Sequence, residues 1–279
     1  MKQFIKIHKQ SIPIALLFFF ASPLFCAQKG GPKFKPIPPT EQELNFEFEK
    51  ITGINKQIAS DVTPLVLGCK NEVEIAKILY RQVKIWGEWG IRYSMDSSEK
   101  SRVRTAIDVY RDKKGDCNEI SSLLYGTYRY AVTTLYDKDP DLRPCFVAAT
   151  IFQELPKDYQ YDIFFTENDD VVTNESGKPG ILRYHMYFAL LSTKPRAGWE
   201  KRIDPDFDEP IYLYTIDPTS IERGPSPTFR YSETRLLVDK QDIIAIYYQD
   251  AMASAIKSKN AEMFSAYLKK YKKFGKGRK

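Results

Sequence analysis

The stretch KKGDCNEISSLLYGTYRYAVTTLY, residues 113–136, decides the fold of this chain. It opens on residues that favour a turn. Apolar side chains then follow at near-helical spacing, at Ile120, Leu123, Leu124, Tyr128, Ala131 and Leu135. We therefore predict a turn over residues 113–116 and a long helix that begins at or next to Cys117 and runs through Tyr136.

The residues before this stretch predict more helix. Between residue 41 and about residue 90, apolar side chains lie near one helical face, for example Val73, Ala76, Ile78 and Leu79. Gly87 and Gly90 interrupt that pattern, and residues 91–93 (Ile-Arg-Tyr) predict extended chain. Residues 105–110 predict a short helix that leads into the turn.

After residue 144 the apolar period changes toward two, which is typical of strands. β-branched and aromatic residues are concentrated in segments bounded by turn-forming residues, at 145–153, 161–165, 183–191, 211–216 and 235–238. Helices first and strands afterwards favour an α+β domain. In this domain an antiparallel sheet is expected to pack on the helix that begins near Cys117.

The C-terminal part of the chain becomes helical again. Residues 242–259 and 261–273 predict two amphipathic helices, which together form a helical hairpin, and basic residues gather in 269–279. A single helical pair cannot bury its own apolar face, so it should dock on the main domain or on a partner. We therefore expect a main domain over residues 41–238 and a helical hairpin with a basic tail over 239–279.

The first residues of the chain predict export. Three lysines precede an apolar run from Ile12 to Phe25, and small residues follow it. This order is typical of a secretory signal over residues 1–27, and the run is short for a membrane-spanning helix. Residues 28–40 are rich in Gly, Pro and Lys and predict a flexible tether. We expect a periplasmic or secreted protein, with an uncleaved amino-terminal anchor as the alternative.

The sequence leaves two routes of processing open. Cleavage after Ala27 gives a mature chain that starts at Gln28. Alternatively, Leu24-Phe25-Cys26 acts as a lipoprotein signal, and acylation of Cys26 attaches the protein to the envelope membrane. The bulky Phe25 argues against acylation, whereas the tether that follows argues for it.

Charge and composition exclude several kinds of function. Residues 1–27 hold three lysines and no acid, so their removal lowers the formal charge from +6 to +3, and we expect no nucleic-acid partner. One of the two histidines lies in the signal and no C-x-x-C occurs, so we expect neither a metal site nor a cofactor. In an exported protein, Cys69 and Cys145 can pair, provided that Cys117 stays a free thiol.

The candidate catalytic residues are Cys117, His185 and Asp217. After residue 27, His185 is the only histidine, so any imidazole base must be His185. Cys117 opens a predicted helix, where backbone N–H groups and the positive helix end favour a thiolate. Asp217 ends the predicted strand 211–216, from which a carboxylate can hold the imidazole of a neighbouring strand in the correct tautomer.

Three motifs around these residues resemble the transglutaminase-like superfamily. Arg104-Thr105-Ala106 with Lys113-Lys114-Gly115-Asp116-Cys117-Asn118-Glu119 is similar to its nucleophile segment, Tyr184-His185-Met186-Tyr187 to its histidine strand, and Thr215-Ile216-Asp217-Pro218-Thr219 to its aspartate segment. The resemblance covers roughly residues 70–220. It implies a papain/transglutaminase-like α+β core, a bacterial exported member and a Cys-His-Asp triad that needs no cofactor.

The chain departs from the family pattern in its spacing. The separations from Cys117 to His185 and from His185 to Asp217 are long for bacterial members. The excess falls in 158–180 and 194–210, which are polar and rich in turn residues, and surface insertions cost little loop entropy. Asp204 also precedes a proline and is the rival for the third position. We prefer Asp217, because a strand leads into it and a threonine follows its proline.

The chemistry expected from this set is acyl transfer on an amide of a peptide or protein. Cys117 attacks the carbonyl, His185 moves the proton, and water or an amine resolves the thioester. Water gives a peptidase or amidase and an amine gives crosslinking; we favour hydrolysis, because excluding water requires a specialised cleft. The alternative is a non-catalytic envelope module that binds a protein or peptide on the same fold. The sequence does not define an oligomeric state.

Overall fold

The computed structural model describes residues 38–94, 104–136, 139–154, 171–173, 179–204, 206–219, 230–257 and 261–274. The chain divides into two units, Met1–Ile37 and Pro38–Lys279, and every described residue belongs to the second. The predicted signal, most of the tether and the predicted strand 161–165 therefore lie outside the described residues. Within the described part, no helix combines the length and the apolar character needed to cross a bilayer.

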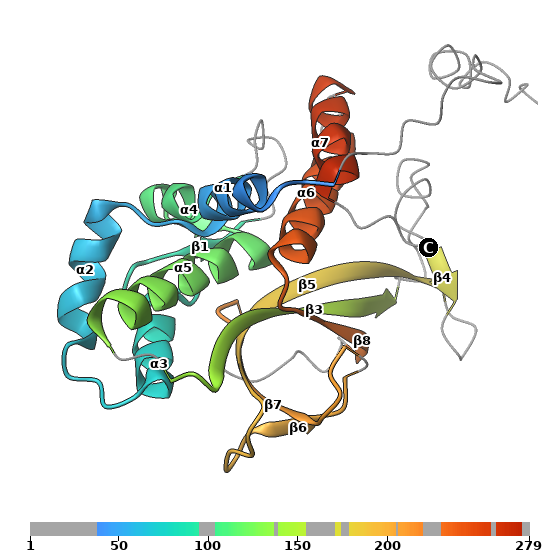
Figure 1. Ribbon diagram of the computed structural model, residues 1–279. Coiled ribbons are helices and arrows are strands. Elements are labelled where there is room, and N and C mark those ends of the chain that lie inside the picture. The colour runs from blue at the N-terminus through green and yellow to red at the C-terminus, as the bar shows by residue number, and fades with distance from the viewer. Residues whose placement is uncertain are drawn as a thin grey trace, which may run out of the picture. The chain divides into compact units, whose positions relative to one another are not determined.

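Among the described residues, five helices precede the sheet (Figure 1): α1 (Glu41–Thr52), α2 (Lys56–Val66), α3 (Glu72–Val83), α4 (Ala106–Asp112) and α5 (Cys117–Leu135). Each begins after a side chain that accepts a hydrogen bond from the first turn, namely Thr40, Asn55, Asn71, Thr105 and Asp116. The region predicted as helical from residue 41 is thus three helices, because capping residues divide it.

The predicted central helix is confirmed as α5, which starts at Cys117 and ends one residue before Tyr136. Asp116 and Glu119 form a capping box that fixes this start: the Asp116 side chain accepts from the Glu119 N–H, and the Glu119 carboxylate accepts from the Asp116 N–H. Most of the helix is buried. Helix α5 is therefore the axis on which the rest of the domain packs.

The strands that follow α5 form a curled antiparallel sheet (Figure 1). The order is β6-β7-β5-β3-β8, and β4 also pairs with β5. The strands are β3 (Leu142–Glu154), β4 (Val171–Thr173), β5 (Pro179–Ser192), β6 (Glu200–Arg202), β7 (Ile211–Ile216) and β8 (Arg230–Leu237). The predicted strand 211–216 matches β7 at both ends, whereas β3, β5 and β8 are longer than predicted and β4 and β6 were not predicted.

The two faces of the sheet bury different cores. One face packs on α5: the Tyr125 ring stacks on Phe146 of β3 at 4.9 Å, and the Tyr128 ring meets Phe188 of β5 at 5.3 Å. The other face encloses a smaller apolar cluster within the curl, formed by Cys145, Val147, Ala189, Leu191, Ile211, Leu213 and Leu236. The predicted α+β class, with an antiparallel sheet against the central helix, is confirmed.

Two further helices, α6 (Lys240–Lys257) and α7 (Ala261–Phe274), follow the sheet and pack against each other and on α1. Buried Glu47 of α1 accepts a hydrogen bond of 2.6 Å from the Tyr248 hydroxyl and forms an ion pair with Lys270. Lys273 pairs with Glu43. Two of the C-terminal lysines therefore bind the main domain.

The contact between α5 and the end of α1 depends on Gly126. A Cβ atom at this position would overlap the carbonyl oxygen of Thr52 and meet Ile54. We expect Gly126→Ala to lower the free energy of unfolding by about 1–3 kcal/mol, because overpacking forces backbone shifts. In an open helix the same substitution has the opposite effect, because alanine stabilises a helix by roughly 1 kcal/mol relative to glycine. Urea unfolding followed by circular dichroism measures it.

Gly68→Ala is the matched control for Gly126→Ala, since a Cβ atom at Gly68 would meet no atom within 4 Å. Its free energy of unfolding should stay within about 0.5 kcal/mol of the wild type. A Gly126→Ala variant as stable as the wild type would contradict the close approach of α5 to the end of α1.

Candidate active site

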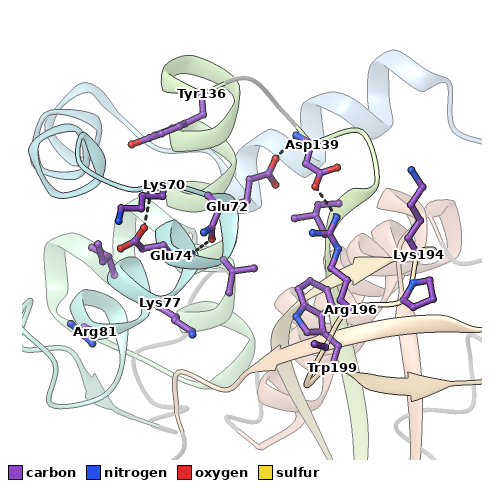
Figure 2. A pocket seen from close by; sticks show the side chains of 16 residues that line it. Lys70, Glu72, Glu74, Lys77, Arg81, Tyr136, Asp139, Lys194, Arg196 and Trp199 are labelled. Atoms are coloured by element: carbon purple, nitrogen blue, oxygen red, sulfur yellow. Dashed lines mark hydrogen bonds and ion pairs between the residues drawn. The ribbon is translucent and has the colours of Figure 1, made fainter.

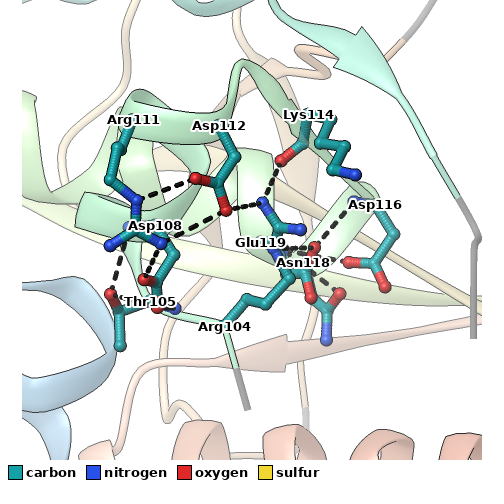
Figure 3. Close-up of polar contacts among 9 residues, drawn as sticks. All are labelled: Arg104, Thr105, Asp108, Arg111, Asp112, Lys114, Asp116, Asn118 and Glu119. Carbon is teal, nitrogen blue, oxygen red and sulfur yellow. Dashed lines mark hydrogen bonds and ion pairs between the residues drawn. The ribbon is translucent and has the colours of Figure 1, made fainter. Parts of the chain in front are cut away.

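Polar contacts fix the turn that precedes Cys117 and the first turn of α5 (Figure 3). Arg104 donates to the backbone oxygen of Lys114 at 2.9 Å and to the Asp112 carboxylate at 3.1 Å. Its guanidinium also lies 3.8 Å from the carboxylate of Glu119, which belongs to the capping box. One arginine therefore joins the end of α4, the turn and the first turn of α5.

The predicted turn before Cys117 contains a short strand. Strand β2 (Lys114–Gly115) pairs in parallel with β1 (Arg92–Tyr93), so the predicted extended segment after Gly90 is confirmed. Gly115 permits close packing, because a Cβ atom there would lie 3.1 Å from Val109 and 3.2 Å from Glu119. These contacts fix the direction in which the chain enters α5 at Cys117.

His185 and Asp217 meet on neighbouring strands. The distance from His185 Nε2 to Asp217 Oδ2 is 2.7 Å. The other carboxylate oxygen, Asp217 Oδ1, accepts from the Thr219 N–H at 2.9 Å and from the Thr219 hydroxyl at 2.7 Å. Both oxygens of Asp217 are therefore engaged, one with the imidazole and one with the turn that follows the strand.

The contacts of Asp217 assign the tautomer of His185. Burial raises the pKa of the Asp217 carboxyl, but the hydrogen bond and charge of His185 and the two hydrogen bonds from Thr219 outweigh it, so the pKa lies below its ordinary value. A carboxylate only accepts hydrogen bonds, so Nε2 of His185 carries the proton toward Asp217. Nδ1 is then the ring nitrogen available for proton exchange with a nucleophile.

Helix α5 packs on β5, the strand that carries His185. The Ser121 hydroxyl of α5 donates a hydrogen bond of 3.0 Å to the Met186 carbonyl of that strand.

This hydrogen bond shows which face of α5 is turned toward the histidine strand. Residues four apart lie on the same face of a helix and are separated by one turn, about 6 Å. Ser121 is bonded to the neighbour of His185, so Cys117 lies on the face of α5 that is turned toward β5, one helical turn nearer to its N-terminus.

The loop between α3 and β1 links the segments of Asp217 and Cys117. The Ile85 N–H donates to the Pro218 carbonyl at 2.8 Å, and the Arg92 N–H donates to the Lys113 carbonyl at 2.9 Å. Between them, Trp86 adopts a left-handed backbone conformation with φ of 58°. Segments far apart in sequence are thus joined by backbone hydrogen bonds on this side of the domain.

The three candidate side chains retain limited access to solvent. Cys117 is 8% exposed, and the side chains of His185 and Asp217 are 13% and 22% exposed. Such partial burial suits a site that must admit a substrate carbonyl while keeping its charges poorly hydrated.

The rival aspartate and the other cysteines lie elsewhere. Asp204 is buried and forms an ion pair of 3.1 Å with Arg202, so Asp217 and not Asp204 is the partner of His185. Cys69 belongs to the core around the helices and Cys145 to the core inside the curl, and both thiols are free. The pairing of Cys69 with Cys145 that the sequence left open is therefore not formed, since the two cysteines lie in separate cores.

The cysteines also differ in acidity. Burial raises the pKa of the Cys69 thiol, with a further contribution from the Glu74 charge. Burial raises the pKa of the Cys145 thiol well above its usual range, and Arg202 offsets only part of this. Neither setting favours a thiolate.

Sequence reasoning missed two positioning residues, Arg104 and Ser121. Arg104 lies within the motif quoted for the nucleophile segment, but its contacts depend on the fold of the turn. The sequence signal for Ser121 is a polar residue on the apolar side of the predicted helix. Among the described residues, no group of three or more His, Cys, Asp or Glu side chains is arranged to hold a metal ion.

No protein-family model matches this chain, and the comparisons with curated proteins and with solved structures find no match either.

Proposed function

We propose that this chain is a transglutaminase-like cysteine enzyme that transfers the acyl group of a peptide or protein amide. Cys117 is the nucleophile, His185 the base and Asp217 the residue that orients the imidazole. The proposal includes a papain-like core, made by α5 and the sheet, and a C-terminal helical hairpin, made by α6 and α7. The observation that carries it is the hydrogen bond of 2.7 Å between His185 and Asp217 beside the helix that starts at Cys117.

The proposed reaction starts with the transfer of the Cys117 thiol proton to His185 Nδ1. The thiolate attacks the amide carbonyl carbon, and the carbonyl oxygen becomes an oxyanion close to the first N–H groups of α5. His185 then returns its proton to the leaving amine as the C–N bond breaks, which leaves a thioester on Cys117. Asp217 stabilises the imidazolium that exists between the two proton transfers.

We propose hydrolysis as the main outcome of the second half-reaction. The side chains of His185 and Asp217 keep part of their surface exposed to solvent, so water reaches the imidazole. His185 takes a proton from a water molecule that attacks the thioester, and the acid and the free thiol are released. An amine in place of water would give crosslinking with the same residues.

We also propose that the enzyme acts outside the cytoplasm, in the periplasm or as a secreted or envelope-bound protein. The support is the sequence of residues 1–27 and of the tether 28–40. A free catalytic thiol in such a compartment must avoid oxidation, and the separate burial of Cys69 and Cys145 gives Cys117 no disulfide partner among the described residues.

The experiment that tests the proposed function is alkylation by iodoacetamide at neutral pH, read by mass spectrometry of peptides. We expect Cys117 to react at least about tenfold faster than Cys69 and Cys145, because the pKa of the two other thiols is raised, whereas Cys117 stands at a helix N-terminus, where a thiolate is favoured. His185→Ala should lower the rate at Cys117, because the imidazole no longer accepts the thiol proton.

His185→Gln is the second variant, since glutamine keeps a polar side chain of similar length but cannot act as a base. It should lower the rate as His185→Ala does, while circular dichroism stays unchanged. Equal alkylation of the three cysteines, unaffected by either variant, would contradict the proposed enzyme and favour the non-catalytic binding module.

A further inference from the structure

A charged groove runs along α3 (Figure 2), and the three candidate catalytic residues are not among those that line it. Its volume is about 1200 Å³. One wall is α3 with the residues just before it, from Lys70 to Arg81, and the other wall is the segment from Lys194 to Trp199. Tyr136 and Asp139, which follow the end of α5, close one end. We call this feature the α3 groove.

The acidic residues of the α3 groove are already bound within the protein. Glu72 accepts from the Tyr128 hydroxyl at 2.5 Å and from the Asp139 N–H at 2.6 Å. Glu74 accepts from the Lys70 N–H at 2.7 Å, and Asp139 pairs with Arg196 at 2.7 Å. Their negative charges therefore serve the fold of the groove, and none is directed to a ligand cation.

Several cations of the groove remain available for a ligand. Within the described part of the chain, the side chains of Lys70, Lys77 and Arg81 are exposed and form no ion pair with a carboxylate. Figure 2 shows these three residues on one side and Lys194, Arg196 and Trp199 on the other. The α3 wall therefore presents the positive charge of the groove, whereas Lys194 and Arg196 of the opposite wall are paired with Asp141 and Asp139.

The geometry of α3 suits an extended chain with alternating acids. Lys77 and Arg81 are one helical turn apart, about 6 Å, and side chains on one face of an extended strand repeat every 6.7 Å or so. From Glu72 to Arg81 the helix spans about 14 Å, the length of about four extended residues. Half-exposed Trp199 adds an apolar surface on the opposite wall, with Arg196 stacked 5.6 Å from its ring.

The groove leads toward the candidate catalytic residues. Four residues after Arg81, the Ile85 N–H donates to the carbonyl of Pro218, the residue that follows Asp217. Lys77 lies over the ring of Tyr214, at 5.6 Å, on the strand that ends before Asp217. A chain lying along α3 therefore has one end near the segment that carries Asp217.

We infer that the α3 groove binds an extended acidic segment of a peptide or protein, with carboxylates at alternate positions on Lys77 and Arg81. That this segment belongs to the substrate of Cys117 rests on the proposed function; the binding itself does not.

The test uses the purified full chain and a fluorescein-labelled peptide of four Glu-Ser repeats, with a Gln-Ser peptide as its uncharged match. Fluorescence anisotropy should show binding of the acidic peptide at low salt, weaker binding at 0.5 M salt and none of the Gln-Ser peptide. The double variant Lys77→Glu with Arg81→Glu should raise the Kd at least about tenfold, because two attractions become repulsions.

The double variant Lys56→Glu with Lys201→Glu is the matched control. Both lysines are exposed and lie outside the groove, so the net charge changes equally while the Kd should stay within about twofold. If the control variant weakens binding as much as the groove variant does, the net charge of the protein explains the binding, and the inference about the groove is contradicted. Equal binding of the Glu-Ser and Gln-Ser peptides would overturn it as well.

The same measurement separates this inference from the proposed function. Cys117→Ala should bind the acidic peptide as the wild type does, because the groove lies outside the reacting groups. If the peptide binds but Cys117 is not reactive, the peptide-binding groove is supported and the proposed enzyme activity is contradicted. If Cys117 is reactive but the peptide does not bind, only the inference about the groove is contradicted.

Discussion

Cys117→Ala should lower the turnover of p-nitrophenyl acetate by about 10³-fold or more, because the acyl group then has no nucleophile to receive it. The activated ester makes the measurement independent of the natural substrate. In the wild type we expect a burst of nitrophenol equal to the enzyme concentration and an acetyl adduct on Cys117 in the mass spectrum. His185→Ala should lower turnover by about 10²- to 10⁴-fold, because proton transfer is lost.

Cys69→Ala is the control for this result, because it removes a thiol whose pKa is raised by burial and which lies outside the site. It should keep the burst and at least half of the turnover. A Cys117→Ala variant that still forms the burst, or an adduct found on another residue, would contradict the role given to Cys117.

Asp217→Asn should lower the same turnover by about 10²- to 10⁴-fold with little change in fold. An asparagine amide can donate to Nε2 of His185, and the imidazole proton would then sit on Nδ1. A protonated Nδ1 cannot accept the proton of the Cys117 thiol. Thr219→Val removes one of the two hydrogen bonds to Asp217 Oδ1 and keeps the backbone one. We expect the turnover of Thr219→Val to fall about two- to tenfold, which corresponds to the free energy of one hydrogen bond.

Asp204→Asn tests the choice between the two Asp-Pro segments. Asparagine can keep hydrogen bonds in the buried site beside Arg202, so turnover should stay within about twofold of the wild type even if stability falls. A loss of turnover in Asp204→Asn, with Asp217→Asn active, would reverse the assignment of the carboxylate.

The sequence predicts well those helices and strands in which a regular apolar pattern continues over many residues or whose ends are marked by turn-forming residues. Helix α5 repeats its apolar spacing over five turns and starts at a Gly-Asp turn, so both its ends were predicted within one residue. Strand β7 is bounded by Pro210 and by Asp217-Pro218, and its ends match the prediction. Strands β2, β4 and β6 have two or three residues each, too few for an alternating pattern to appear.

The site shows the same limit. A strand leads into Asp217 and Thr219 follows it, and both features, which are visible in the sequence, contribute to the contact with His185. No local pattern could reveal that Ser121 binds the Met186 carbonyl, because the two residues are 65 positions apart and meet only when α5 packs on β5. The α3 groove joins residues 70–81 to residues 194–199, a pairing that exists only after the sheet has brought both to one side of α5.

The contact of α1 with the last two helices constrains the order in which the chain can fold. Buried Glu47 pairs with Lys50 of its own helix, and its two further partners, Tyr248 and Lys270, are 201 and 223 residues further along the chain. The contacts of α1 with α6 and α7 can form only after these helices have been synthesised, so α1 completes its native packing late. The amino-terminal helix is among the first to leave the ribosome and among the last to reach its final packing.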